Sequence, residues 1–306
     1  APDHYAIDTD VHPVTLKTAN STVAVSNNAT SKFYETPLGS VRTTKVDADH
    51  PDVLLSGAEF TVYNSDKATV YGKLAETSKG TYQLDEIPAG TYYLRETKAP
   101  QYYNIDNTFY QFTISDAGKI VDVSINGNDK FPNAPQKGSI KIVKKSADGV
   151  LSGWQFRVTG TAKTGQSYDK TFTTDAKGTI TISNIRIGDY KVTEVKTGKT
   201  VGYITENSKD LEVKTDTVTT VNIENKPYAN IVINKVDSVK GTALSGATFG
   251  IYTDAECEIP AQAYTSATDD TLTDAEITES ATGKYTCNYL PISSATGTTY
   301  YVKELT

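Results

Sequence analysis

The stretch Gly138-Ser-Ile-Lys-Ile-Val-Lys144 has two counterparts, Gly39-Ser-Val-Arg-Thr-Thr-Lys45 and Ala229-Asn-Ile-Val-Ile-Asn-Lys235. After each of them the chain continues with Leu-Ser-Gly and a short segment that contains phenylalanine. Each repeat then reaches a Tyr-x-x-x-Glu segment, which ends at Glu96, Glu194 and Glu304. The repeats follow one another at about 90 to 100 residues, the size of one small β-sandwich. The sequence therefore predicts a tandem array of similar domains.

Composition and periodicity favour strands in every repeat. The chain has 20 Tyr and 21 Gly among 306 residues, and it is rich in Thr and Val. Apolar and polar residues alternate from Ile140 to Lys144, from Tyr92 to Glu96 and from Val221 to Asn225. The only helix that we expect is a short one around Thr273–Ser280. The fold class is therefore predicted to be all-β, with Ig-like β-sandwich domains in a linear array.

Charge and motif content exclude several classes of function. The formal net charge is −7, whereas a nucleic-acid binder would carry a basic stripe. No apolar run is long enough for a transmembrane helix, so we expect no membrane insertion. No catalytic constellation, cofactor motif or metal-binding motif stands out, so we expect no conventional enzyme, no cofactor and no bound metal. The chain lacks Met, and we expect a processed product or a fragment.

The first residues of the chain resemble the back half of the first repeat. Ala1-Pro-Asp-His-Tyr5-Ala-Ile-Asp8 matches Ala99-Pro-Gln-Tyr-Tyr103-Asn-Ile-Asp106, and the match continues to residues 32–37. The expected domains are therefore a closing part at 1–38, full repeats at 39–137 and 138–228, and a repeat without its last strands at 229–306. Two explanations stay open. The chain is a piece of a longer array, or residues 1–38 of one molecule complete the last domain of the next by strand donation.

Alternation also predicts which polar residues point inward, because side chains two apart on a strand share a face. A lysine, a glutamate and an asparagine share the strand face of the apolar residues. These are Lys45, Glu96 and Asn133 in the first repeat, Lys144, Glu194 and Asn225 in the second, and Lys235 with Glu304 in the third. Burial of separate charges is costly unless the groups are paired or neutral.

Two arrangements of such a trio are open from the residues alone. One is a buried lysine–glutamate salt bridge with a hydrogen-bonded asparagine. In the other, desolvation makes the amine neutral and the carboxyl protonated. The amine then attacks the asparagine side-chain carbonyl, ammonia leaves, and the glutamate shuttles the protons of a single-turnover reaction.

The first full repeat resembles the Cna-B-type (collagen-adhesin B-type, SpaA-like pilin) domains of Gram-positive surface adhesins and pilins. The resemblance rests on Leu55-Ser-Gly-Ala-Glu-Phe60, Gly80-Thr-Tyr82 and Ala89-Gly-Thr-Tyr-Tyr-Leu-Arg-Glu96-Thr-Lys-Ala-Pro100. Domain two departs from the pattern, because it has Trp154 in place of alanine and lacks the Ala-Pro that follows the glutamate.

The resemblance implies autocatalytic isopeptide bonds between lysine and asparagine, each assisted by an acidic residue. By position, these are Lys45–Asn133 with Glu96 and Lys144–Asn225 with Glu194. Lys145 leaves the second assignment open by one residue, although alternation favours Lys144. In the third repeat Glu304 is the acid, and the partner of Lys235 is uncertain. Glu35 of another copy aligns with the asparagine position. A salt bridge or no bond is therefore expected there.

The resemblance also implies a function. We expect a stalk or shaft segment of an adhesin or pilus, attached to the cell wall on the outside of a Gram-positive bacterium. The expected partners are neighbouring domains or subunits of the same array. The alternative is a module that binds a host matrix protein or glycan. Cys257 and Cys287 are an even pair, which leaves a disulfide or two free thiols open.

Overall fold

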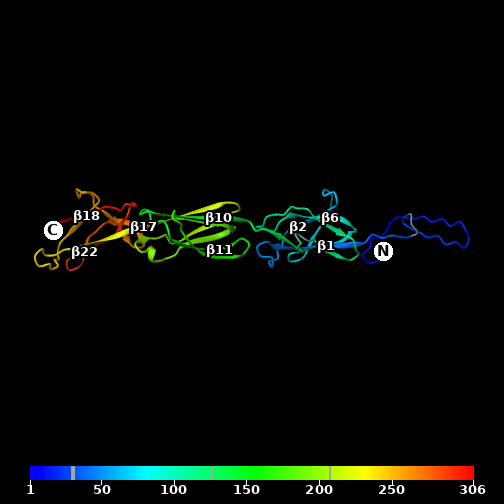
Figure 1. Ribbon diagram of the computed structural model, residues 1–306, viewed down its shortest axis with the longest axis horizontal. Coiled ribbons are helices and arrows are strands. Elements are labelled where there is room, and N and C mark those ends of the chain that lie inside the picture. Colours follow the sequence, from blue (N-terminus) through cyan, green and yellow to red (C-terminus); the bar gives the residue numbers. More distant parts are fainter. Residues whose placement is uncertain (29–31, 124, 126, 207) are drawn as a thin grey trace. The chain divides into compact units, whose positions relative to one another are not determined.

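The computed structural model describes residues 1–28, 32–123, 125, 127–206 and 208–306. The chain divides into two compact units, Ala1–Gln136 and Lys137–Thr306. Both units consist of β-strands and loops (Figure 1), and the one helix within the described residues is the 3-10 turn Gly198–Thr200. The described part of the chain contains no helix that is long and apolar enough to cross a membrane. The predicted all-β fold is confirmed.

Two sheets sandwich the core of the first unit. The first sheet contains β4 (Ala75–Ser78), β5 (Thr81–Pro88), β1 (Leu38–Asp47) and β8 (Ile120–Asp122) in this order, with β9 (Lys130–Asn133) also paired with β1. The second sheet contains β3 (Val70–Lys73), β2 (Glu59–Tyr63), β6 (Gly90–Lys98) and β7 (Tyr110–Ile114). Side chains from both sheets, including Phe60, Leu94 and Phe131, form one buried core.

The burial of β1 follows the alternation of its sequence. Val41, Thr43 and Lys45 are buried, whereas the residues between them are only half-buried. Because these three residues share a face of the strand, the lysine enters the core together with the apolar side chains. The inward orientation that alternation predicts for Lys45 is thus confirmed.

The second unit begins with a sandwich of the same design. One of its sheets contains β13 (Thr179–Arg186), β10 (Lys137–Ser146), β17 (Val218–Asn234), β22 (Lys284–Pro291) and β21 (Thr278–Ala281), with β15 (Tyr203–Ile204) also paired with β17. The facing sheet contains β12 (Ser167–Thr173), β11 (Gln155–Ala162), β14 (Gly188–Glu194) and β16 (Ser208–Val213). Trp154, Phe156 and Val192 lie in the core that these sheets enclose.

Strand β17 belongs to two repeats at once. Its first half, from Val218 to Asn225, runs parallel to β10 and closes the sandwich of residues 138–228. Its second half, from Tyr228 to Asn234, runs antiparallel to β22 and opens the next repeat. Pro227 lies between the two halves. Proline has no N–H to donate to a ladder, and the Pro227 carbonyl accepts a hydrogen bond from the backbone N–H of Ile292.

The remaining strands of residues 229–306 form small sheets. The strands β18 (Phe249–Tyr252) and β23 (Tyr301–Glu304) make one pair, and β19 (Gln262–Ser266) and β20 (Asp269–Asp274) make another. The helix expected around Thr273–Ser280 is wrong, because this segment holds the end of β20 and the start of β21. Thr273 pairs with the buried Ala263, and Thr278 pairs with Thr286, so tertiary pairing overrides a weak local preference.

Candidate functional site

In the first unit, three strands bring the predicted lysine, glutamate and asparagine together. Lys45 lies on β1 directly opposite Phe131 of the parallel strand β9, and Asn133 follows two residues later on the same face. Glu96 comes from β6 in the other sheet, where it pairs with Phe60. The amine and the carboxamide thus belong to one sheet, and the carboxyl group reaches them across the core.

The contacts within this trio are close, and the groups are fully buried. The Lys45 amine lies 3.5 Å from Glu96 Oε1 and donates to the carbonyl of Phe131 at 2.9 Å. The Asn133 side-chain N–H donates to both carboxyl oxygens of Glu96, at 2.8 and 2.9 Å. Lys45 and Glu96 are 0% exposed and Asn133 is 1% exposed. One carboxyl group therefore touches both of the groups that a crosslink would join.

Burial shifts the acid–base behaviour of both titratable groups toward their neutral forms. Desolvation lowers the pKa of Lys45 to about 8, although the nearby Glu96 opposes the shift. Desolvation also raises the pKa of Glu96 above its ordinary value, against the opposing effect of the lysine. Burial in the core thus reduces the free-energy difference between the ion pair and the neutral pair. In the neutral pair a nucleophilic amine lies beside a protonated acid.

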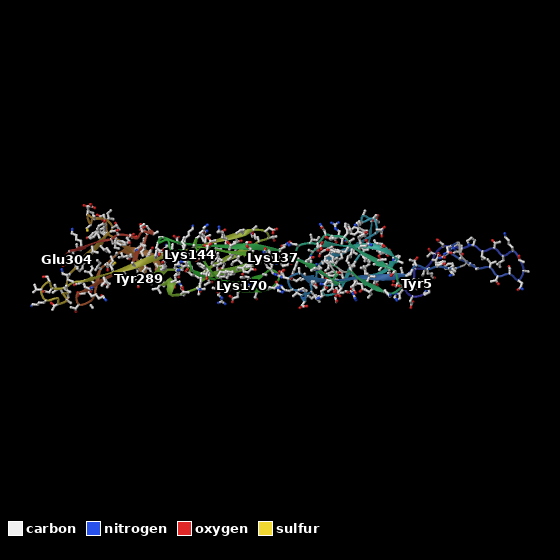
Figure 2. The ribbon with its side chains drawn as sticks, in the orientation of Figure 1. Tyr5, Lys137, Lys144, Lys170, Tyr289 and Glu304 are labelled. Carbon is white, nitrogen blue, oxygen red and sulfur yellow. The ribbon has the colours of Figure 1, made fainter. Side chains whose placement is uncertain are left out.

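The second unit repeats the trio with the same register. Lys144 on β10 lies opposite Ile223 of the parallel strand β17, and Asn225 follows two residues later. The Asn225 side-chain N–H donates to Glu194 Oε1 at 2.9 Å, and all three side chains of the trio are buried. Lys145 is exposed, so the lysine that faces the core is Lys144, which is labelled in Figure 2.

The electrostatics of the second trio match those of the first. Desolvation lowers the pKa of Lys144 to about 8 and raises the pKa of Glu194. The Lys144 amine donates to the carbonyl of Lys145 at 2.6 Å. Two cores with different side chains therefore produce the same shift in amine pKa.

Each asparagine keeps one buried polar atom without a partner among the described residues. These atoms are Oδ1 of Asn133 and Oδ1 of Asn225. Glu194 Oε2 is also buried without a hydrogen-bond partner among the described residues. A buried acceptor without a hydrogen bond is costly. The two ends of a carboxamide have nearly the same shape, so a half-turn of the amide directs Oδ1 at the carboxyl group. A protonated glutamate would then donate to that oxygen and make the carbonyl carbon more electrophilic.

The third repeat holds two members of the trio in a more open setting. Lys235 lies 2.6 and 2.7 Å from the two carboxyl oxygens of Glu304, and the two side chains are 31% and 43% exposed. Glu304 pairs with Phe249, in the same register as the other two glutamates with their phenylalanines. Within the described part of the chain β23 pairs with β18 alone, whereas β6 and β14 each have a second neighbour.

Two tyrosine–aspartate pairs next to the trios were not predicted from the sequence. The Tyr103 hydroxyl donates to Asp47 at 2.7 Å, and the Tyr203 hydroxyl donates to Asp148 at 2.5 Å. Asp47 is the last residue of β1 and Asp148 follows β10, so each pair ties the end of the lysine strand to the chain that follows the glutamate strand. A signal was present, because both tyrosines come shortly after the glutamate and both aspartates come shortly after the lysine.

The cysteines take no part in these sites. Both are free thiols in the structure. Cys287 is buried on β22, opposite Ile231. Cys257 lies in a turn, where its backbone N–H donates to the carbonyl of Asp254.

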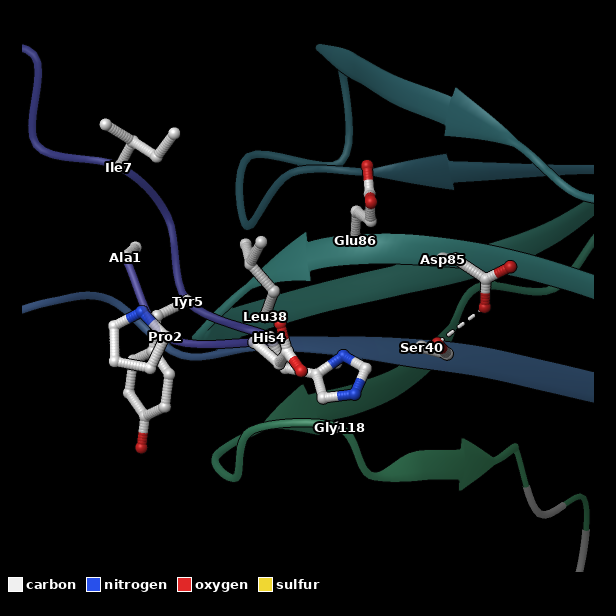
Figure 3. Close-up of a pocket in the computed structure, with 12 residues that line it drawn as sticks. Ala1, Pro2, His4, Tyr5, Ile7, Leu38, Ser40, Asp85, Glu86 and Gly118 are labelled. Carbon is white, nitrogen blue, oxygen red and sulfur yellow. Dashed lines mark hydrogen bonds between the residues drawn. The ribbon is translucent and has the colours of Figure 1, made fainter.

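A surface pocket of about 390 Å³ lies where residues 1–7 meet the start of β1 (Figure 3). The Ser40 hydroxyl at its wall donates to Asp85 at 2.6 Å. Gly118 has φ +70°, and a Cβ at this position would lie 2.9 Å from the ring of His4, so the wall requires glycine here. Since the serine is hydrogen-bonded to a carboxylate and not to the histidine, the pocket has no nucleophile of the serine–histidine kind. The candidate chemistry lies in the two cores.

Comparisons with known proteins agree with the fold. The profile of the SpaA family, described as a prealbumin-like fold domain, matches residues 39–129, 138–227 and 229–306. No curated protein sequence matches the chain significantly. Among solved structures, the Bacillus anthracis TIE protein is similar, with 21% identity and a TM-score of 0.53 over 88% of this chain. The match spans only 45% of that protein.

Two solved pilins match with lower scores. A streptococcal ancillary pilin has 17% identity and a TM-score of 0.32, with 88% of this chain and 90% of that chain covered. BcpA, the major pilin subunit of Bacillus cereus, has 15% identity and a TM-score of 0.34, with 87% of each chain covered.

Proposed function

Because the chain belongs to the SpaA family of prealbumin-like fold domains, we propose that it is a structural segment of a pilus or adhesin stalk on the surface of a Gram-positive bacterium. We propose further that two isopeptide bonds, Lys45–Asn133 and Lys144–Asn225, stiffen it. The observation that carries the proposal is the buried trio, which recurs with the same register and the same pKa shifts. A conventional binding or catalytic site would not need this arrangement in two successive domains.

The bond forms in one turnover. The neutral amine of the lysine attacks Cγ of the asparagine, while the protonated glutamate donates a hydrogen bond to Oδ1. A new C–N bond forms, and the proton of the amine passes through the carboxyl group to the departing nitrogen. The old C–N bond breaks and ammonia leaves, so the product is an amide and the glutamate is regenerated. No oxidant, metal or external enzyme takes part.

The bond would lie on the path of tension. In the first domain it joins β1, which enters the domain, to β9, which closes it. In the second domain it joins β10 to β17, and β17 continues as one strand into residues 229–306. Tension on neighbouring parallel strands would shear their hydrogen bonds, and a covalent link between them carries that load instead. A reductant, which cleaves disulfides, leaves such an amide intact.

Intact-mass measurement on the denatured chain tests the bonds. Two bonds predict a mass below the sequence mass by two ammonia molecules, about 34 Da by stoichiometry. Single-molecule pulling tests the mechanical role, because the segments between the crosslinked residues would not extend. A full sequence mass together with full extension of both domains would contradict the proposal.

We also propose a partner, namely a second copy of the chain whose residues 1–38 complete the domain 229–306. The backbone around Tyr5 and Pro37 repeats the bridge between Tyr103 and Pro135, which closes the first domain. Apolar side chains are exposed on both surfaces, such as Ile7 in the N-terminal segment and Val302 on β23. Apolar surface on both sides would be buried by such a contact.

Glu35 provides a sharp test of this partner. It aligns with the asparagine position, so in a head-to-tail assembly it would face Lys235 and, because it has no side-chain amide that could lose ammonia, form no isopeptide bond. We expect the wild-type chain to associate with rising concentration in light scattering. The Glu35→Asn variant should add a covalent ladder on denaturing gels, and Lys235→Met in the same chain should remove it. A monomer at every concentration, without a ladder in Glu35→Asn, would contradict the assembly.

A further inference from the structure

An aromatic ring covers the lysine amine in each of the two complete trios. The amine of Lys45 lies 4.7 Å from the centre of the Phe131 ring, and the amine of Lys144 lies 4.4 Å from the centre of the Trp154 ring. Both aromatic side chains are buried. Each amine therefore has an apolar wall on one side.

The two rings come from different places in the domain. Phe131 lies on the closing strand β9, two residues before the asparagine, and the second domain has Ile223 at that position. Trp154 follows the Leu-Ser-Gly segment, and the first domain has Ala58 at that position. The large ring and the smaller side chain have thus exchanged positions between the domains. This exchange keeps a ring over the amine in both.

Neighbouring groups hold each ring in place. The Trp154 indole N–H donates to the carbonyl of Val150 at 2.8 Å, and its ring packs edge-on against Tyr203 at 4.9 Å. Phe131 packs edge-on against Phe60 at 4.9 Å and against Tyr110 at 5.4 Å. Fixed rings of this kind exclude water from the amine.

Two effects of such a ring oppose each other. A ring face attracts an ammonium ion and so favours the charged amine. Exclusion of water disfavours the charged amine. Desolvation by burial is the largest cause that lowers the pKa of each lysine to about 8. Each ring is part of the wall that buries the amine, and it limits the directions in which the amine can turn.

We propose that Phe131 and Trp154 are positioning residues for amide formation, and that this role has moved from the closing strand to the Leu-Ser-Gly segment in the second domain. The proposal rests on the proposed function, because it concerns the same two bonds. It assigns a purpose to Trp154, the residue at which the second domain departs from the pattern of the first. It also explains why Ile223 is tolerated beside the second amine.

The test uses variants of one domain at a time, and the unaltered domain of the same chain serves as an internal control. The chain is recovered unfolded from inclusion bodies, refolded at a series of pH values and quenched, and ammonia loss is followed by intact mass and peptide mapping. We expect Trp154→Ala to slow the Lys144–Asn225 bond at least tenfold, since each unit of rise in the amine pKa lowers the neutral fraction about tenfold. The high-pH limit of the reaction should move upward from about pH 8. The Lys45–Asn133 bond should form as before.

The double variant Trp154→Ala/Ile223→Phe gives the second domain the arrangement of the first, and we expect it to restore both the rate and the pH limit. The reciprocal variant Ala58→Trp/Phe131→Ile should leave the first bond intact, whereas Phe131→Ile alone should slow it. Circular dichroism checks the fold of each variant. A wild-type rate and pH limit in folded Trp154→Ala, or a double variant as slow as the single one, would overturn the proposal. Where Trp154→Ala does not fold, the reciprocal pair decides in the same way. Absence of both bonds in the wild type would contradict the proposed function instead.

Discussion

Replacement of Lys144 by methionine removes the amine but leaves an unbranched side chain of similar length in the core. The wild-type side chain is buried against Trp154, and a thioether packs well against an aromatic ring. The substitution therefore takes away the proposed crosslink with little change in packing. Since the proposed bond would close a loop of about 80 residues, its loss should lower the free energy of unfolding by about 4–5 kcal/mol in the chain-entropy treatment of crosslinks.

This loss is large enough to be read from a melting curve. For a domain of this size, it corresponds to a fall in the melting temperature of roughly 20–30 °C. We expect calorimetry of the whole chain to show one transition moved down and the transition of the first domain unchanged. Intact mass should show that the deficit falls from two ammonia molecules to one. Lys145→Met is the matched control, because Lys145 is the exposed neighbour on the same strand.

Two results would refute this reasoning in different ways. If Lys144→Met kept the full mass deficit, another residue would be the nucleophile. The deficit could instead fall by one ammonia while the transition moves no further than in Lys145→Met. Closure of the loop would then not lower the conformational entropy of the unfolded chain by the expected amount. Either result can be obtained from the same two protein preparations.

The remaining predictions concern the acid and the proton that it shares with the amine. Glu96→Gln keeps the shape of the side chain but cannot shuttle a proton, so the Lys45–Asn133 bond should fail during refolding while the second bond forms; both ammonia losses at the wild-type rate would exclude Glu96 as the shuttle. The rate of each bond should be flat while the lysine–glutamate pair shares one proton. It should fall above about pH 8, where the pair loses that proton, and below the raised pKa of the glutamate, where both groups are protonated. A rate that kept rising above pH 8 would mean that the neutral amine suffices without an acid.

Strand alternation predicts the inner faces of the strands well. It places Lys144 inside and Lys145 outside, because each successive side chain on a strand points to the opposite face, and the structure agrees. It cannot predict how deeply a residue is buried when the cover comes from other strands. Lys235 shares the inner face of its segment, but it is 31% exposed, because β23 has one neighbour within the described residues.

Contacts between strands far apart in the sequence could not be predicted from the sequence pattern. Trp154 is visible in the sequence as a departure from the repeat, but nothing local indicates that its ring lies over Lys144. The exchange with Ile223 involves two positions about 70 residues apart, which only the packing of the two sheets brings together. The expected helix at Thr273–Ser280 failed for the same reason, since pairing with other strands decided its structure.

Peptide mapping of the denatured chain tests the central claim most directly. Trypsin does not cleave after an acylated lysine, so the account predicts two branched peptides, one joining residue 45 to residue 133 and the other joining residue 144 to residue 225. Each should be lighter by one ammonia than the sum of its two arms. Recovery of the four separate, unmodified peptides in full yield would contradict the account.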